Sequence, residues 1–325
     1  MTPFVGYHCA AEQFAPSELV EFAVAAEAAG FQGATMSDHL HPWQDNQGHA
    51  GHAWMMLAAI AAKTERFVVG TGITCPIYRH HPLEVAHAFA TLGVLFPGRV
   101  FLGVGTGEAV NEAPSGWGPY RERSERLVEA IHLIRQLWTG GWVDFEGQYY
   151  HVRDAKLYDV PASPVPIYVA ASGPRSVRIA AREGDGWITD HRTIRRGEAQ
   201  KRTFEAEARA AGKDPAVMPR VTELWAVAGD REEALAAARR WQFLPVFPDV
   251  VDLPDPRVVQ QRAEELSSPE RVVDGWVVGP DAETHVAAVR ELAAAGATHI
   301  FLHSPQEDQR MVIDFYRRHV LPALR

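Results

Sequence analysis

Short apolar segments alternate along this chain with longer segments of helical periodicity, and this alternation constrains the fold more than any other feature. Eight segments are predicted as strands: Phe4–Cys9, Gly33–Met36, Arg66–Gly72, Val100–Gly105, Val165–Ala170, Gly186–Thr189, Val221–Val227 and His299–His303. Helical segments lie between most of them, for example Pro16–Ala29, which Gly30 follows as a predicted C-terminal cap. Strands that alternate with helices form parallel sheets. Eight repeats predict an α/β fold, a (β/α)8 TIM barrel.

The length of the chain agrees with one such barrel. It has 325 residues, of which 46% are hydrophobic and 22% charged. A barrel of roughly 250 residues with insertions accounts for this length, so we expect a single domain over residues 1–325, with two domains as the alternative. Insertions are expected near residues 140–160 and 244–275. A hairpin is predicted from Val143–Phe145 and Tyr149–Val152, and an ordered loop or lid from the proline-rich Leu244–Pro256.

Charge and cysteine content exclude several classes of partner. A formal net charge of -9 and a pI near 5.9 argue against nucleic acid and anionic membranes, because both need a basic surface. Cys9 and Cys75 are the only cysteines, so no disulfide framework is expected. The segment from Met1 to Ala15 does not resemble a signal peptide, and no apolar run approaches about 18 residues. The sequence therefore predicts a soluble, cytoplasmic protein that acts on a small molecule.

The segment after the second predicted strand, Ser37–Trp43, is the densest cluster of titratable and aromatic residues. Catalytic groups of (β/α)8 barrels follow the strands. His39 is a candidate base for an alcohol proton, since an imidazole titrates near neutral pH and a nearby carboxylate can orient it. The alternative is that Asp38 caps the following loop while His39 only packs.

The fourth strand leads into a glycine-rich segment, Gly103–Glu108. Its glycines would let a planar ligand approach the backbone, and Glu108 could serve as an acid or base. The spacing differs from the dinucleotide-binding fingerprint. A plain glycine-rich turn with a solvated Glu108 is the alternative.

Two later segments predict anion binding. Ala171-Ser172-Gly173 opens directly into a helix, whose first N–H groups suit a phosphate; a plain helix cap by Ser172 is the alternative. The stretch Asp190–Gly197, followed by Lys201 and Arg202, is basic and suits a phosphorylated substrate or an acidic cofactor tail, or else is a solvated helix start. The fifteen histidines show no metal-binding spacing, so no metal is expected.

Four segments together carry a resemblance to a known family. They are Ala11–Pro16, Ser37–His39 with Pro42-Trp43, Phe101–Glu108 and Tyr158–Pro161. In these segments the chain resembles the F420-dependent glucose-6-phosphate dehydrogenases, which belong to the luciferase-like flavin and deazaflavin oxidoreductases. The similarity runs from Phe4 to the region of His303 and is weakest between His191 and Asp274.

The resemblance implies a luciferase-like barrel, usually a homodimer, that binds coenzyme F420 at the carboxyl ends of the strands. By this resemblance His39 would take the proton of the substrate hydroxyl and Glu108 would protonate the reduced ring. Asp38, Trp43 and Glu12 would complete the catalytic site. The cofactor contacts implied by the family are Asp38, Cys75, Gly105, Thr106, Gly107, Asn111, Ala171, Ser172 and Gly173.

The chain departs from the family pattern in places that concern the substrate. Cys75 stands where the family has threonine, and His41 where it has a glutamine-like residue. Of three basic residues for a sugar phosphate, Lys201 is retained, Arg262 replaces the second with its charge, and the third falls at Gly275.

These departures leave several functions in competition. The leading hypothesis is oxidation of a sugar 6-phosphate of the glucose-6-phosphate type at C1, with the arginines after Asp190 compensating for Gly275. The second is an F420-dependent dehydrogenase of an unphosphorylated sugar or secondary alcohol. Less favoured are an FMN-dependent monooxygenase and a cofactor-binding protein without catalysis.

Overall fold

Eight parallel strands form a closed barrel in the computed structural model, which describes residues 2–325. The strands are β1 (Phe4–Cys9), β2 (Gly33–Met36), β3 (Val68–Thr71), β4 (Val100–Val104), β7 (Ile167–Ala170), β8 (Gly186–Ile188), β9 (Arg220–Val227) and β11 (His299–His303). Pairing of β8 with β9 and of β11 with β1 closes the circle. The two-residue strand β10 (Val277–Val278) adds only to the edge of β9. The predicted (β/α)8 barrel is confirmed.

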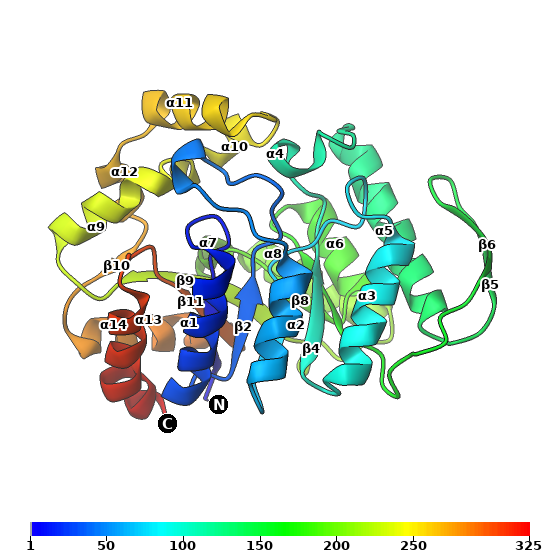
Figure 1. Cartoon of the computed structure of the whole chain (residues 1–325), viewed down its shortest axis with the longest axis horizontal. Helices are drawn as coiled ribbons and strands as arrows, with labels where there is room; N and C mark the ends of the chain where they lie inside the picture. Colours follow the sequence, from blue (N-terminus) through cyan, green and yellow to red (C-terminus); the bar gives the residue numbers. More distant parts are fainter. Residues whose placement is uncertain (1) are drawn as a thin grey trace.

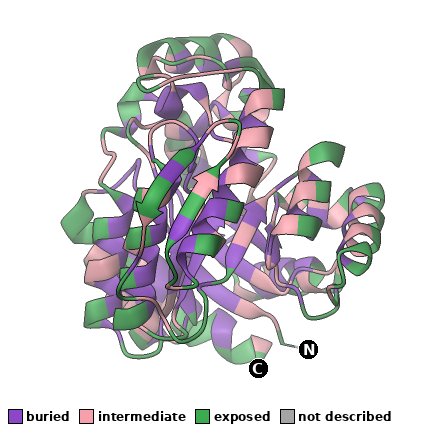
Figure 2. Cartoon of the chain, turned by 90° about the vertical axis from the view of Figure 1, so that its right-hand side faces the viewer, coloured by how far each residue is buried: buried purple, intermediate pink, exposed green. Residues whose placement is uncertain are grey.

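Helices surround the barrel (Figure 1). The main ones are α1 (Pro16–Ala29), α2 (Ala53–Lys63), α3 (Pro82–Leu95), α5 (Tyr120–Leu137), α6 (Pro174–Glu183), α8 (Glu198–Ala210), α9 (Arg231–Ala238), α13 (Ala282–Ala294) and α14 (Gln309–Phe315). Figure 2 shows their inner faces buried and their outer faces exposed. The sequence did not predict α2, whose alanines and buried Trp54, Leu57 and Ile60 leave little polar face. No helix within residues 2–325 is long and apolar enough to cross a membrane.

Aromatic rings fill the amino-terminal half of the barrel interior. Phe101, Val221 and Phe301 form a buried cluster, and Phe4 and Tyr168 pack against it. These side chains come from different strands and meet at the centre, which identifies the inward-facing positions of each strand. Since side chains alternate between the two faces of a strand, every second residue beyond them also points inward. A functional site inside the barrel must therefore lie in the layers of side chains nearer the carboxyl ends of the strands.

Two segments stand outside the repeat of barrel strands and surrounding helices. The hairpin is β5 (Val143–Glu146) paired with β6 (His151–Ala155), at the right of Figure 1. The carboxylate of Glu129 on α5 accepts backbone hydrogen bonds from Gln148, Tyr149 and Tyr150, at 2.6 Å for the last. These bonds tie the hairpin to the barrel.

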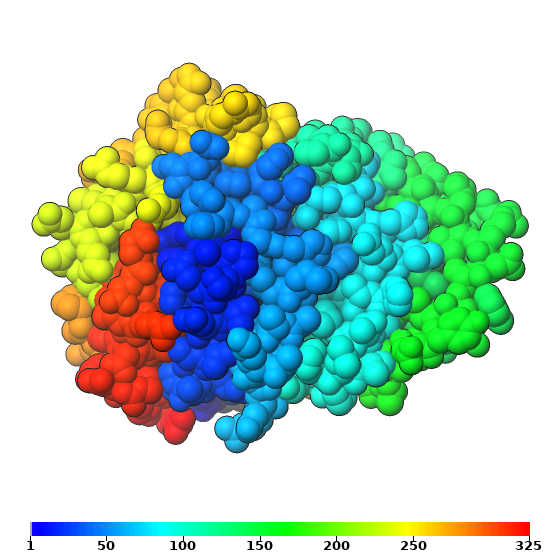
Figure 3. Space-filling model, viewed as in Figure 1, coloured from blue at the N-terminus to red at the C-terminus, as the bar shows by residue number. Residues whose placement is uncertain are grey.

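The second insertion is helical, which corrects the expectation of a loop over 244–256. A single turn at Leu244–Val246 leads into α10 (Phe247–Val250), and α11 (Pro256–Leu266) and α12 (Pro269–Val273) follow. Each begins with a proline within its first two positions, where a helix needs no N–H donor, so the prolines start these helices rather than prevent them. Figures 1 and 3 show this segment, in yellow to orange, at the end of the barrel opposite the two chain termini.

Candidate active site

His39 and Glu12 meet at the carboxyl end of the barrel. His39 follows β2, Glu12 follows β1, and the distance from Nε2 of His39 to Oε1 of Glu12 is 3.3 Å. Glu12 is buried, and its other oxygen accepts a hydrogen bond from the Ser37 hydroxyl at 2.6 Å. Burial by itself would raise the pKa of Glu12, but the His39 and His8 rings and the Ser37 hydroxyl outweigh it and lower this pKa. Glu12 is therefore an ionised carboxylate beside an imidazole.

The contacts of His39 define what a base at Nε2 requires. Its Nδ1 lies 2.9 Å from the carbonyl oxygen of His41, which can only accept a hydrogen bond, and 3.1 Å from the amide nitrogen of Asn111, which can only donate one. A base at Nε2 needs the tautomer in which Nδ1 carries the hydrogen and donates it to His41. Nε2 then presents a lone pair. Because ionised Glu12 is only an acceptor, its contact with Nε2 becomes favourable when Nε2 takes up a proton.

Asp38 does not pair with its neighbour His39. Its carboxylate is fully buried and accepts hydrogen bonds from Arg79 at 2.9 Å and from the Thr74 hydroxyl at 2.5 Å, with His80 at 3.4 Å. Burial would raise the pKa of Asp38, but His80, Arg79 and Thr74 hold it well below its usual value. Neither alternative from the sequence describes this residue, since Asp38 anchors the loop after β2 to the loop after β3.

Glu108 is the second titratable group of the candidate site. It follows β4 as the residue before the short helix α4 (Ala109–Glu112). Burial raises the pKa of Glu108, although His39, a hydrogen bond from Asn111 and Arg123 act in the opposite direction. A carboxyl group with a raised pKa suits a proton donor, whereas ionised Glu12 does not.

Arg123, which the sequence analysis missed, stabilises the turn Gly105-Thr106-Gly107. Arg123 on α5 donates hydrogen bonds to the carbonyl oxygens of Thr106 at 3.2 Å and of Gly107 at 3.0 Å. Gly107 has a φ of 70°, and a Cβ there would lie 3.1 Å from Sγ of Cys75, so a larger residue would be strained and crowded. Cys75 is buried, which raises the pKa of its thiol and leaves it an uncharged packing residue.

Asn111 connects the short helix α4 to the loop after β2. Its side-chain oxygen accepts hydrogen bonds from the backbone of Leu40 at 2.9 Å and of His41 at 3.3 Å. The structure therefore gives Asn111 a role in holding the loop that carries His39. Its implied contact with the cofactor stays a prediction.

Ala171, Ser172 and Gly173 lead into α6, as the sequence predicted. Gly173, rather than Ser172, is the residue at the start of the helix, and its N–H donates to the Ser176 hydroxyl at 3.2 Å. The cap by Ser172 is therefore wrong. The small Gly173 leaves space, since a Cβ there would meet only the Ser176 oxygen at 3.8 Å. This keeps the helix start open to an anion.

The basic residues expected for a sugar phosphate are bound to glutamates of their own helices. Lys201 on α8 pairs with Glu198 at 2.9 Å. Arg262 on α11, with about half of its side chain exposed, pairs with Glu265 at 3.2 Å. At Gly275 a Cβ would lie 3.6 Å from a guanidinium nitrogen of Arg192, so a cation from another segment reaches this place.

An aromatic stack lies beside the candidate base. Trp43 stacks on Phe243 at 4.6 Å between ring centroids and meets His39 edge-on at 5.7 Å. Phe243 and the nearby Trp241 belong to the segment between α9 and the predicted lid, and the sequence analysis did not single them out.

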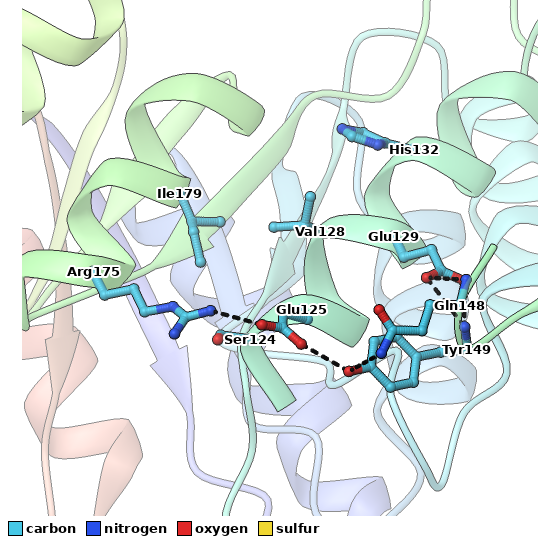
Figure 4. A pocket seen from close by; sticks show the side chains of 9 residues that line it. All are labelled: Ser124, Glu125, Val128, Glu129, His132, Gln148, Tyr149, Arg175 and Ile179. Atoms are coloured by element: carbon cyan, nitrogen blue, oxygen red, sulfur yellow. Dashed lines mark hydrogen bonds and ion pairs between the residues drawn. The ribbon is translucent and has the colours of Figure 1, made fainter. Parts of the chain in front are cut away.

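A hollow outside the barrel is separate from these residues. It lies between α5, α6 and the hairpin, and Figure 4 shows Arg175 bonded to Glu125, whose other oxygen bonds Tyr149. The paired charges and the open surface give it no arrangement suited to catalysis.

Comparisons with known proteins agree with this geometry. The sequence profile described as luciferase-like monooxygenase matches residues 2–299. The chain is 50% identical over 323 residues to the F420-dependent hydroxymycolic acid dehydrogenase of Mycobacterium tuberculosis, covering 99% of this chain and 88% of that protein. It is 40% identical to the F420-dependent glucose-6-phosphate dehydrogenase of Mycolicibacterium fortuitum, covering 99% and 98%. A solved structure of an F420-dependent secondary alcohol dehydrogenase with an F420–acetone adduct superposes with a TM-score of 0.93, at 33% identity and full coverage of both chains.

Proposed function

This chain belongs to the luciferase-like monooxygenase family, and from that premise we propose that it is an F420-dependent dehydrogenase that oxidises the CH–OH group of an alcohol. One observation carries the proposal: a histidine after β2 and a carboxyl group with a raised pKa after β4 both lie at the carboxyl end of the barrel. His39 stands beside the ionised Glu12, and burial raises the pKa of Glu108. Oxidation of an alcohol by hydride loss needs a base for its proton and an acid for the acceptor.

The residues of the chain fit this cofactor. F420, when bound, supplies a deazaflavin ring that accepts the hydride. Glu108, whose raised pKa favours the protonated carboxyl, would hold a proton beside that ring, and Nε2 of His39 would take the proton of the substrate hydroxyl. Glu12 stabilises the imidazolium so formed. The open start of α6 at Gly173 is a place for the phosphate of the cofactor.

Two substrate classes fit different observations. An uncharged secondary alcohol or hydroxylated compound is favoured by the engagement of Lys201 and Arg262 with their own glutamates. A sugar 6-phosphate is favoured by the relatives at about 40% identity and by Arg192, which reaches the place of the missing cation at Gly275. We also expect a homodimer, as the resemblance implies, which light scattering on the purified protein would test.

The deciding experiment uses purified protein with oxidised F420. Loss of the absorbance of the oxidised cofactor is followed with propan-2-ol, glucose and glucose 6-phosphate as separate substrates. Turnover with at least one of them, abolished in His39→Ala, supports the proposal. Binding of FMN in preference to F420, or unchanged turnover in His39→Ala, would refute it in favour of the monooxygenase or the non-catalytic alternative.

A further inference from the structure

Three polar side chains meet inside the barrel below the candidate base. They are His8 on β1, Glu223 on β9 and His303 on β11. Nδ1 of His8 lies 3.3 Å from one oxygen of Glu223, and Nδ1 of His303 lies 3.2 Å from the other. The two histidines are buried, but 35% of the Glu223 side chain is exposed. Because Glu223 stands two residues after the inward-facing Val221, this exposure means that solvent reaches the interior layer.

The ring geometry favours hydrogen bonding by the two imidazoles over binding of a metal ion. The imidazoles of His8 and His303 are stacked, with centroids 4.2 Å apart and planes 27° apart. In-plane lone pairs of stacked rings run side by side, whereas metal ligands must converge on one point. Here Nδ1 of His303 forms a hydrogen bond with its own oxygen of Glu223, whereas Nδ1 of His8 has its shorter contact, 2.9 Å, with the Thr35 hydroxyl. These hydrogen bonds account for both Nδ1 atoms without a metal ion.

The carboxylate is the charged member of this cluster. Burial would raise the pKa of Glu223, but His8 and His303 lower it to about 2. Burial lowers the pKa of His8 to about 4, so this ring is neutral at neutral pH. An ionised carboxylate has two lone pairs on each oxygen, and the hydrogen bond from His303 uses one of them. Glu223 therefore offers the interior free acceptors and a negative charge.

An aromatic face lies next to these acceptors. Trp225, two residues further along β9, stacks on His303 at 3.5 Å between centroids and meets Trp241 edge-on at 4.8 Å. Trp225 is half-buried. A carboxylate beside an indole face suits a molecule with C–H groups on one side and hydroxyl groups at its edge.

We propose that Glu223 is a specificity-determining residue that accepts a hydrogen bond from a second hydroxyl group of an uncharged substrate and excludes anionic groups from the barrel interior. The inference rests on the proposed function, because it concerns the same alcohol. It favours polyhydroxy alcohols over phosphorylated or carboxylated ones.

Three small alcohols that share one reacting carbon test the proposal. Propan-2-ol, propane-1,2-diol and lactate differ only in a methyl, a hydroxymethyl or a carboxylate group. For the wild type with F420 we expect kcat/KM to be highest for the diol, about tenfold lower for propan-2-ol and lower still for lactate. In Glu223→Gln, which keeps an acceptor without the charge, we expect the lactate value to rise about 10- to 100-fold relative to the diol. In Glu223→Leu the preference for the diol over propan-2-ol should disappear.

The order of the three alcohols is the diagnostic, since a general loss of structure would lower all three together. Glu232→Gln, at an exposed position of α9, is the matched control and should keep the wild-type order. The proposal would be overturned if the ratios of kcat/KM among the three alcohols changed by less than threefold in both Glu223 variants. It would also be overturned if the wild type preferred lactate. If the wild type binds F420 but oxidises none of them, the proposed function fails. Titration of the loaded protein, followed by cofactor fluorescence, then still ranks the three ligands and decides the role of Glu223.

Discussion

Replacement of Glu12 by glutamine tests how the site activates His39. Glu12 is nearly isosteric with glutamine, and its contact with Nε2 of His39 is 3.3 Å long. Two unit charges at that distance interact by about 5 kcal/mol at an effective dielectric constant of 20. Glutamine keeps an acceptor oxygen, so about half of this stabilisation of the protonated imidazole should remain. The loss of about 2–3 kcal/mol predicts a fall in kcat of roughly 100-fold.

The assay is steady-state reduction of F420 with the best alcohol, with the cofactor dissociation constant and thermal unfolding measured on the same samples. We expect unchanged F420 affinity and a loss of thermal stability smaller than that of Asp38→Asn, because the lowered pKa of Glu12 means that its ionised form stabilises the fold, but no buried cation loses a close ion pair. Ser37→Ala, which removes the 2.6 Å hydrogen bond to Glu12, should lower kcat by about tenfold.

Asp38→Asn provides the contrast. Asp38 is fully buried and pairs with Arg79 at 2.9 Å, so this variant removes the nearer of the two carboxylates that pair with this buried cation and should lose about 3 kcal/mol of stability. A kcat for Glu12→Gln within threefold of the wild type would refute the reasoning. So would a Glu12→Gln variant as unstable as Asp38→Asn, since Glu12 would then serve the fold rather than the base.

Three further outcomes are expected. Glu108→Gln should lower kcat by about 10²- to 10⁴-fold. Because burial raises the pKa of Glu108, the wild type loses stability as pH rises through that pKa. In urea unfolding, the free energy of unfolding of the variant relative to the wild type should therefore be higher at neutral pH than at acidic pH. Burial lowers the pKa of His8 from 6.5 to about 4, so the wild type should lose up to about 3 kcal/mol as pH falls across that range, and His8→Gln should lose less in the same titration. Gly70→Ala should cost about 1–3 kcal/mol in thermal unfolding because its Cβ would overlap the ring of Phe101, whereas the exposed Gly141→Ala should be close to neutral.

The sequence by itself determined the barrel and the segments that carry chemistry. Its apolar runs predicted all eight barrel strands, three of them with the same bounds as β1, β2 and β11. Residue order is enough for this, because side-chain periodicity is a local property and parallel strands bring their carboxyl ends together. His39, Glu108 and Gly173 were expected at strand ends for that reason. The resemblance added Glu12, which the spacing of residues alone did not single out.

Only the tertiary structure decided which side chains meet. Glu12, rather than the adjacent Asp38, contacts His39, and Lys201 and Arg262 pair with glutamates of their own helices. Glu223 had one signal in the sequence, its place two residues from Val221 and Trp225 in a strand. Its partners His8 and His303 lie on β1 and β11, at opposite ends of the chain, and they come together only because the barrel closes between those strands. Distances between residues far apart in sequence depend on that closure, and no local pattern encodes it.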